Sequence, residues 1–365
     1  MLHPTEQAAY NEILWNGGLA KADLARRLGV SRTRMTAVGR ELELAGLVAP
    51  AGREARTTRG RPGDTLVALP DRFHFLGVHV RARQLVAAVI DLENRVVWES
   101  DAVVSNMSAE LILDRCREWL EEARAAGFVV AAVAFCGSYE QLDDAPPGVT
   151  LRAILDDGER ARFAERLGGP VWVEDDMVAL TAFEHWPRLA DGQDSMALIA
   201  LGSQIGFGIV IDRRIVVGAH RTAGRFAHVL VADDGPVCPL GHRGCLWGMS
   251  SISSILEQIP GVDTFEEAVQ SAATDPASAR VLDAAAWGLG AGVAQIANLL
   301  DPDKVVLAGE ARRLLDGRED RFDDGLSDAH LGAVPIIETT DFGFVEWARA
   351  AAALALYRSL GGNRV

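Results

Sequence analysis

The sequence has 365 residues, which is too long for one ordinary hydrophobic core and indicates two or three folding units. It contains no run of eighteen apolar residues, which argues against a membrane-spanning helix, and its first residues lack the pattern of a secretory signal. Four cysteines in a chain of this length do not predict a disulfide framework, and Cys116 and Cys136 are expected to be buried thiols. We therefore expect a cytoplasmic protein.

The net charge of −15 is distributed unevenly along the chain. Residues 1–63 contain ten Lys and Arg against six Asp and Glu, a net charge of +4, so the remaining residues carry −19. A basic head on an acidic body is typical of proteins that contact nucleic acid locally. An excess of this size also arises by chance, so charge alone does not decide the function.

The first 46 residues predict three helices. Residues 5–16 have apolar side chains at helical spacing, residues 21–29 form a second short helix, and Ser31 is suited to cap a third helix over residues 31–46. Helix, short turn and helix is the helix-turn-helix pattern. Four apolar side chains of the third helix are expected in its core: Met35, Val38, Leu42 and Leu44. A glycine inside this helix, Gly39, departs mildly from the pattern.

The opposite face of the third helix is polar and predicts contact with DNA. Arginine pairs with guanine through two hydrogen bonds, and threonine meets a thymine methyl group or a phosphate. The predicted contact residues are Arg32, Thr33, Arg34, Thr36 and Arg40. Residues 47–70 indicate two short strands around an arginine-rich loop, a wing whose Arg53, Arg56, Arg59 and Arg61 reach the backbone or a minor groove. The alternative is a three-helix protein-interaction unit with a solvated basic face.

The body alternates strands and helices in two successive series. Strands are expected at 73–80, 84–92, 95–104, 128–137 and 170–175, with helices at 108–127, 151–167 and 177–186. The second series has strands at 195–203, 206–212, 213–219, 304–308 and 334–338, and helices near 249–258, 263–273, 278–300 and 344–360. The repeat predicts an α/β fold of two similar lobes with a cleft between them.

Residues 201–251, LGSQIGFGIVIDRRIVVGAHRTAGRFAHVLVADDGPVCPLGHRGCLWGMSS, resemble the signature region of the ROK family of repressors and sugar kinases. With the helix-turn-helix and the RGRP segment, the resemblance covers nearly the whole chain. It implies a winged helix-turn-helix followed by a two-lobed, actin-like (hexokinase-type) ATPase fold. We expect the winged head at 1–70, the first lobe at 71–193 and the second lobe at 194–365, with the last helix packing back on the first lobe.

The phosphate-binding turns that the resemblance implies are altered. Family kinases have a turn of the form Asp-x-Gly-Gly-Thr where this chain has residues 79–83, His-Val-Arg-Ala-Arg, so His79 replaces the acid and both glycines are lost. The second turn, at 202–208, keeps only part of its pattern. In a third turn Glu310 stands where a second glycine is usual, and its charge would repel a phosphate. We therefore expect no ATP use and no enzymatic activity.

The resemblance also implies sugar-contacting positions, and these are partly changed. Asp176 matches the catalytic base and Asp175 the asparagine before it, whereas Val178 replaces a second asparagine. His228 is kept, but Arg225 and Trp247 stand where the family has glutamates. Trp247 is suited to stack on a sugar face. Arg225 indicates an anionic ligand such as a sugar phosphate or acid, or equally a salt bridge to one of the two aspartates. A cleft that binds nothing is the alternative.

Structural zinc in the ROK pattern is held by one histidine and three cysteines. This chain keeps His228, Cys238 and Cys245 at the matching positions, but Leu240 replaces the middle cysteine. Three outcomes remain open: His242 replaces the lost ligand, three ligands hold a metal with an open fourth position, or the site has decayed and Leu240 packs in its place.

These observations favour a DNA-binding transcriptional regulator, a repressor more than an activator, that binds a palindromic double-stranded operator as a homodimer or tetramer. A sugar-like or anionic effector would close the cleft and change the spacing of two winged helices. Two alternatives stay open. One is a sugar kinase with a DNA-binding head, and the other is an effector-independent DNA-binding protein whose body serves for dimerisation or for docking another protein.

Overall fold

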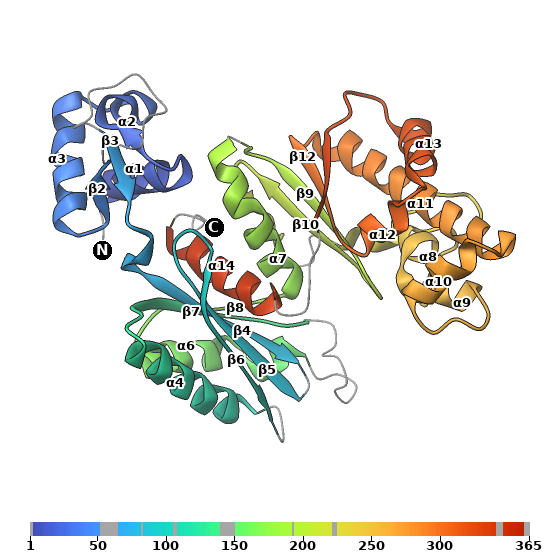
Figure 1. Cartoon of the computed structure of the whole chain (residues 1–365), viewed down its shortest axis with the longest axis horizontal. Coiled ribbons are helices and arrows are strands. Elements are labelled where there is room, and N and C mark those ends of the chain that lie inside the picture. Colours follow the sequence, from blue (N-terminus) through green and yellow to red (C-terminus); the bar gives the residue numbers. More distant parts are fainter. Residues whose placement is uncertain are drawn as a thin grey trace. The chain divides into compact units, whose positions relative to one another are not determined.

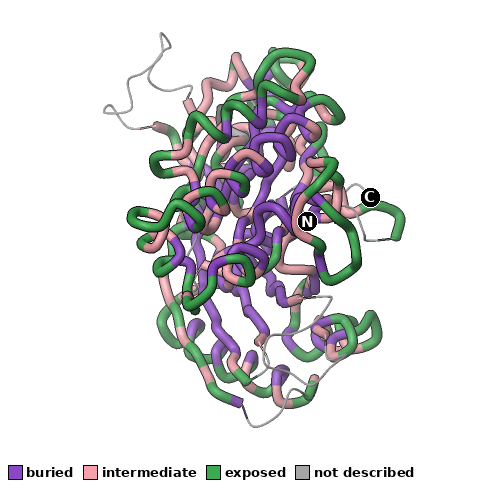
Figure 2. The backbone as a smooth tube through the Cα atoms, turned by 90° about the vertical axis from the view of Figure 1, so that its right-hand side faces the viewer, coloured by how far each residue is buried: buried purple, intermediate pink, exposed green. Residues whose placement is uncertain are grey.

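The computed structural model describes residues 3–51, 65–81, 83–104, 108–138, 150–191, 193–220, 225–340 and 346–360. The chain divides into two compact units. The first comprises Met1–Gly192 together with Phe344–Val365, and the second comprises Gln193–Gly343. Figure 1 shows the elements of each unit, and Figure 2 shows that buried residues concentrate along the central strands. Among the described residues, no helix combines the length and the apolar character needed to cross a membrane.

The N-terminal head contains three helices and a small sheet. The helices are α1 (Pro4–Trp15), α2 (Lys21–Arg27) and α3 (Arg32–Leu44), and the strands β1 (Leu19–Ala20), β2 (Val48–Pro50) and β3 (Thr65–Ala68) pair antiparallel in the order β1-β3-β2. The core of the head consists of apolar side chains at helical spacing, since Ile13, Leu24, Met35 and Leu42 are fully buried. This is the winged-helix arrangement that the sequence predicts.

The first unit continues with a five-stranded sheet in the order β6-β5-β4-β7-β8. Its elements are β4 (His74–Arg81), β5 (Gln84–Ile90), β6 (Val96–Val103), α4 (Ala109–Ala125), β7 (Val130–Cys136), α5 (Leu151–Ile154), α6 (Asp157–Leu167), β8 (Val171–Glu174), α7 (Asp176–His185) and α14 (Glu346–Leu360), with 3₁₀ turns η1 (Pro70–Arg72) and η2 (Trp186–Asp191). The first three strands are antiparallel, and β7 and β8 join parallel to β4.

Side-chain alternation along β4 explains how this sheet is covered on both faces. Leu76, Val78 and Val80 pack into the core that α4 and α6 also line. The residues between them therefore face α14, which lies against β4, β5 and β7 (Figure 1). A Cβ atom on Gly77 would lie 2.0 Å from the carbonyl oxygen of Ala348 and 2.1 Å from the backbone nitrogen of Ala352. Gly77 thus lets the helix backbone touch the strand directly.

The second unit repeats the same sheet plan, in the order β11-β10-β9-β12-β13. Its elements are β9 (Met196–Leu201), β10 (Ile205–Ile211), β11 (Arg214–Ile215), η3 (Arg225–His228), α8 (Leu246–Ser250), α9 (Ile252–Gln258), α10 (Phe265–Ala272), α11 (Pro276–Leu300), β12 (Lys304–Gly309), α12 (Ala311–Leu315), α13 (Glu319–Ala329) and β13 (Ile336–Thr340). An antiparallel hairpin is again extended by parallel strands. The predicted duplication of an α/β lobe is therefore confirmed.

Several expected elements differ from those observed. The single helix expected at 151–167 is two helices, because Asp156 accepts a hydrogen bond from the Glu159 N–H and starts a new helix there. The strand expected at 213–219 ends at Ile215, and α12 and α13 were not predicted. Leu44 is 72% exposed rather than part of the core, because α3 ends at this residue.

We expect Gly77→Ala to destabilise the first unit by more than about 3 kcal/mol, because overpacking against a backbone cannot be relieved by a rotamer change. Chemical denaturation followed by circular dichroism measures the loss. The control is Gly169→Ala, where an added Cβ comes no nearer than 3.4 Å to the Ala131 oxygen. Equal stability of the two variants would contradict the direct contact between strand and helix.

Candidate functional site

The polar face of α3 is presented to solvent as the sequence predicts. Ser31 caps the helix by accepting a hydrogen bond from the Arg34 N–H at 3.1 Å. The side chains of Met35, Val38 and Leu42 are buried in the head. The five predicted contact residues on the other side are exposed: Arg32, Thr33, Arg34, Thr36 and Arg40. One helix face is thus fixed to the core while the opposite face stays accessible.

The buried face of α3 also explains Gly39. A Cβ atom at this position would lie 2.9 Å from Cε of Lys21 and 3.2 Å from Cδ1 of Leu66. Glycine therefore leaves room for the ends of the Lys21 and Leu66 side chains against α3. The helix accepts a propensity cost of about 1 kcal/mol for this close packing.

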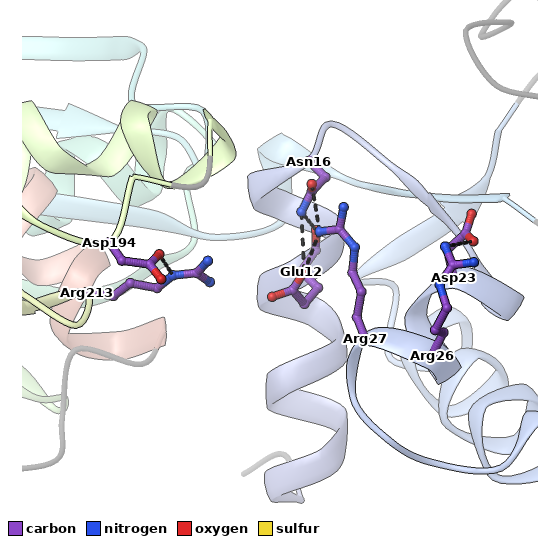
Figure 3. A network of polar contacts seen from close by, with 7 residues as sticks. All are labelled: Glu12, Asn16, Asp23, Arg26, Arg27, Asp194 and Arg213. Atoms are coloured by element: carbon purple, nitrogen blue, oxygen red, sulfur yellow. Dashed lines mark hydrogen bonds and ion pairs between the residues drawn. The ribbon is translucent and has the colours of Figure 1, made fainter. Parts of the chain in front are cut away.

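The basic side chains of the head fall into two classes. Among the described residues outside the polar face of α3, the basic side chains of the head are paired within it: Arg26 pairs with Asp23 at 2.6 Å, and Lys21 pairs with Glu43 at 2.9 Å. Arg27 contacts Glu12 at 2.9 Å and Asn16 at 3.0 Å (Figure 3). By contrast, within the described part of the chain no acidic side chain forms an ion pair with the three arginines of that face, Arg32, Arg34 and Arg40.

The wing is described only at its base. Strands β2 and β3 form an antiparallel pair on either side of it, with Val48 opposite Ala68 and Pro50 opposite Leu66. The arginines predicted to reach DNA from the wing, Arg53, Arg56, Arg59 and Arg61, lie outside the described residues. Their contacts stay a prediction.

The head is attached to the C-terminal helix of its own unit. The Asn11 side-chain amide donates a hydrogen bond to the carbonyl oxygen of Leu360, the last residue of α14. The ring of Trp15 meets that of Trp186 edge to face at 6.4 Å, and Trp186 in turn meets Tyr357 of α14 at the same distance. A polar and an aromatic contact therefore link α1 to the end of α14.

In the second unit four metal-ligand side chains converge. The ligand atoms of His228, Cys238, His242 and Cys245 all lie within 4.8 Å of one another. The Sγ atom of Cys238 is 3.7 Å from Nδ1 of His242, and the Sγ atom of Cys245 is 3.8 Å from Nδ1 of His228. We call these four residues the thiol–imidazole cluster. Two sulfur and two nitrogen donors are a set that tetrahedral structural zinc sites use.

A tight loop brings His242 into the thiol–imidazole cluster. The Cys238 N–H donates to the His242 oxygen at 2.9 Å, and the Gly241 N–H donates to the Cys238 oxygen at 2.8 Å. Burial favours a higher pKa for the Cys238 thiol, but backbone N–H groups of this loop, led by that of His242, outweigh it and lower the pKa. Leu240 is 67% exposed, so of the three outcomes left open by the sequence, the one in which Leu240 packs in place of a ligand does not hold.

The predicted effector residues fall in both units. In the first, Asp175 caps α7 by accepting from the Met177 N–H at 3.0 Å, whereas Oδ1 of Asp176 lies 3.4 Å from Nε2 of His79. In the second, Arg225 is exposed at the rim of an apolar hollow formed by β10 and the end of α11. Trp247 is buried in the core of that unit, and its indole N–H donates to Gln204 at 2.8 Å.

Two features of these sites were missed by sequence reasoning. Gln204, the partner of Trp247, lies inside the second glycine turn at 202–208, but the turn pattern gave no reason to single it out. Cys136, taken only as a buried thiol, lies in a cluster with His79 and Asp176. The available signal was that His79 and Cys136 both come near the ends of predicted strands. Burial and the carboxylates of Asp176 and Asp175 raise the pKa of the Cys136 thiol well above its usual value.

The third glycine turn has a structural reason in this chain. Gly309 adopts a left-handed φ of +71°, and a Cβ atom there would lie 2.3 Å from the Leu201 oxygen. The following residue, Glu310, donates its N–H to the same oxygen at 2.8 Å. The contact between β9 and β12 therefore accounts for this glycine without a phosphate.

The sequence model of the ROK family matches residues 76–316, about two thirds of the chain. The chain belongs to the ROK family. Among ROK relatives, the DNA-binding transcriptional repressor Mlc of Escherichia coli (strain K12) is 23% identical over 257 residues, which cover 68% of this chain and 63% of Mlc. The match thus spans less than two thirds of Mlc.

Solved ROK structures have the same fold. A ROK family transcriptional regulator described as a homolog of the E. coli MLC protein superposes with a TM-score of 0.75 at 20% identity, covering 97% of this chain and 96% of its own. The ROK hexokinase from Thermus thermophilus gives a TM-score of 0.64 at 23% identity, covering 79% of this chain and 100% of its own. The predicted two-lobed fold behind a winged helix is confirmed.

We expect Ser31→Ala to destabilise α3 by about 1 kcal/mol, because the Arg34 N–H loses its acceptor. Hydrogen exchange of the α3 amides should accelerate about fivefold, while exchange in α4 should not change. Ser31→Asp is the matched variant, since its carboxylate can cap the helix, and it should keep the wild-type rate. Equal exchange in all three proteins would show that the cap contributes nothing.

Proposed function

We propose that this ROK chain is a DNA-binding transcriptional regulator, a repressor, that reads double-stranded DNA with α3. The supporting observation is the division of the basic side chains of the head. Lys21, Arg26 and Arg27 are neutralised by carboxylates of the head, whereas the arginines of the polar face of α3 have no such partners among the described residues. Unneutralised arginines on an exposed helix face are what a phosphate or guanine would pair with.

In this proposal the first turns of α3 enter the major groove. Arg32 and Arg34 lie at the start of the helix and would contact base edges, with Thr33 and Thr36 beside them, while Arg40, two turns along, would contact a phosphate. The wing arginines Arg59 and Arg61 would hold the flanking backbone. One head covers one half-site, so a two-fold dimer on a palindromic operator follows as the working assembly.

We further propose that the body is a sensor and not an enzyme. His79 replaces the acid of the first phosphate turn, and the position of Gly309 serves strand packing, so two of the phosphate-binding features have other roles here. The effector would be a sugar-like or anionic small molecule. Its candidate recognition residues are Asp176 of the first unit, and Arg225 and His228 of the second. Trp247 is less suited to stack on a sugar face, because its ring is buried. An effector can shift DNA affinity only by binding two arrangements of the chain unequally.

We also propose that the thiol–imidazole cluster holds structural zinc, with His242 in the role of the missing cysteine. The donor set and the short ligand separations fit a tetrahedral ion. Bound zinc would supply a cross-link that fixes the 228–245 segment, and with it His228, in place. The exposed position of Leu240 favours this account over a decayed site.

The reading of DNA is tested with duplexes enriched from a random-sequence pool by the wild-type chain. Arg32→Ala combined with Arg34→Ala should weaken specific binding by at least about 30-fold, since each base contact contributes about 1–3 kcal/mol. Fluorescence anisotropy over a salt series measures the affinity. The matched control, Arg124→Ala with Arg160→Ala, removes the same charge from exposed positions outside the head and should bind as wild type. If both double variants lose affinity equally, α3 does not read the bases.

Zinc binding is tested by metal analysis of purified chains. His242→Ala should lower the zinc content by one equivalent per chain, because three ligands remain. Adding Leu240→Cys to that variant should restore the equivalent, because it supplies the thiolate of the family pattern. His220→Ala, an exposed histidine of the same unit, is the control and should leave the content unchanged. Unchanged zinc in His242→Ala would remove His242 from the site.

A further inference from the structure

A second group of metal-ligand side chains lies in the first unit. The ligand atoms of His79, Cys136 and Asp176 all lie within 4.8 Å of one another. Nε2 of His79 and Oδ1 of Asp176 are 3.4 Å apart. Tetrahedral sites with metal–ligand bonds of about 2.0–2.3 Å have ligand atoms about 3.3–3.8 Å apart. The three donors therefore need only small movements to reach a common ion.

Strand register places these donors together. His79 and Cys136 are directly paired in the parallel ladder between β4 and β7, so their side chains emerge on the same face of the sheet. β8 is the next strand, and Asp176 is the first residue of α7 after it. The three residues thus sit at the same end of three adjacent strands, which makes their proximity a property of the sheet itself.

The three donors of the cluster are buried to different degrees. The side chains of His79 and Asp176 are 6% and 21% exposed, and Cys136 is fully buried. The ring of Trp347, in the first turn of α14, stacks on the His79 ring at 5.7 Å. The Cys136 thiol lies 3.4 Å from the Trp347 carbonyl oxygen. Asp176 is thus the most exposed of the three donors, and the Trp347 ring covers the imidazole from the α14 side.

We propose that His79, Cys136 and Asp176 form a binding site for a divalent transition-metal ion of the zinc type, separate from the thiol–imidazole cluster. One nitrogen, one sulfur and one oxygen donor suit zinc or cobalt, whereas magnesium and calcium prefer oxygen donors alone. Oδ1 of Asp176 is buried and lies 3.4 Å from Nε2 of His79, and the Cys136 thiol hydrogen-bonds to the same carboxylate. A bound cation would neutralise the negative charge of this carboxylate. It would also displace the thiol proton, so that Cys136 binds as the thiolate. This site does not depend on the proposed reading of DNA.

The test uses cobalt, whose bond to a thiolate gives a charge-transfer band in the near ultraviolet. The full chain carries Cys238→Ser and Cys245→Ser, which removes both thiolates of the thiol–imidazole cluster. We expect this background to bind one equivalent of cobalt with a thiolate band under anaerobic conditions. Adding Cys136→Ser should abolish the band, and adding His79→Ala should weaken cobalt binding at least tenfold. Cys116 is a buried thiol on α4, and adding Cys116→Ser should change neither the thiolate band nor the affinity for cobalt.

Two results would overturn the proposal. One is a background chain that gives no thiolate band with cobalt, which would leave His79 and Asp176 as a simple ion pair beside a protonated thiol. The other is a band that survives Cys136→Ser. Circular dichroism of each variant separates these outcomes from misfolding. If Cys136→Ser does not fold, Asp176→Asn takes its place, because it keeps the size of the side chain and should weaken cobalt binding at least tenfold.

Discussion

The packing of α14 directly on β4 is the contact on which the first unit depends. Gly77 removes the side chain that would hold the two backbones apart, and α14 presents mostly alanines, including Ala348 and Ala352, to the sheet. Such small residues bury little apolar area each, so the helix is held by closeness of fit rather than by large side chains. At its far end Arg358 forms a buried ion pair with Glu174 of β8, 3.2 Å apart. A buried pair of this kind fixes the position of the helix along the sheet more than it adds stability.

Because α14 is fixed in this way, its two ends contact two candidate sites: the cluster around His79 and the N-terminal head. Its first turn carries Trp347, whose ring covers His79 beside Asp176. Its last residue, Leu360, accepts the hydrogen bond from Asn11 of the head. A change that moves the start of a rigid, alanine-rich helix must also move its end, since an intact helix does not absorb displacement along its axis. The contacts thus give events at Asp176 a physical route to α1 within one unit.

Much of this could be predicted from the sequence, because it rests on local periodicity. The spacing of Met35, Val38 and Leu42, together with the cap at Ser31, defines both the buried and the exposed face of α3. The parts that could not be predicted depend on contacts remote in sequence or on loop conformation. His242 enters the thiol–imidazole cluster through a tight loop, and only the strand register brings His79 to Cys136. The close approach at Gly39 likewise depends on Lys21 and Leu66, which the spacing of α3 does not reveal.

The residue at position 79 bears on two proposals at once, the absence of nucleotide binding and the second metal site. An acid in the first phosphate turn suits a hard magnesium ion that accompanies a nucleotide. An imidazole paired across the ladder with a thiol offers the donors that magnesium avoids. In our proposal, the imidazole at this position therefore favours a softer ion than the magnesium of a nucleotide. Strands β4 and β7 lie between α14, which packs on the face that carries His79 and Cys136, and the core lined by α4 and α6 on the opposite face. The sheet is therefore held from both faces, and side chains at its strand ends can differ while its architecture and the contact of the head with α14 stay the same.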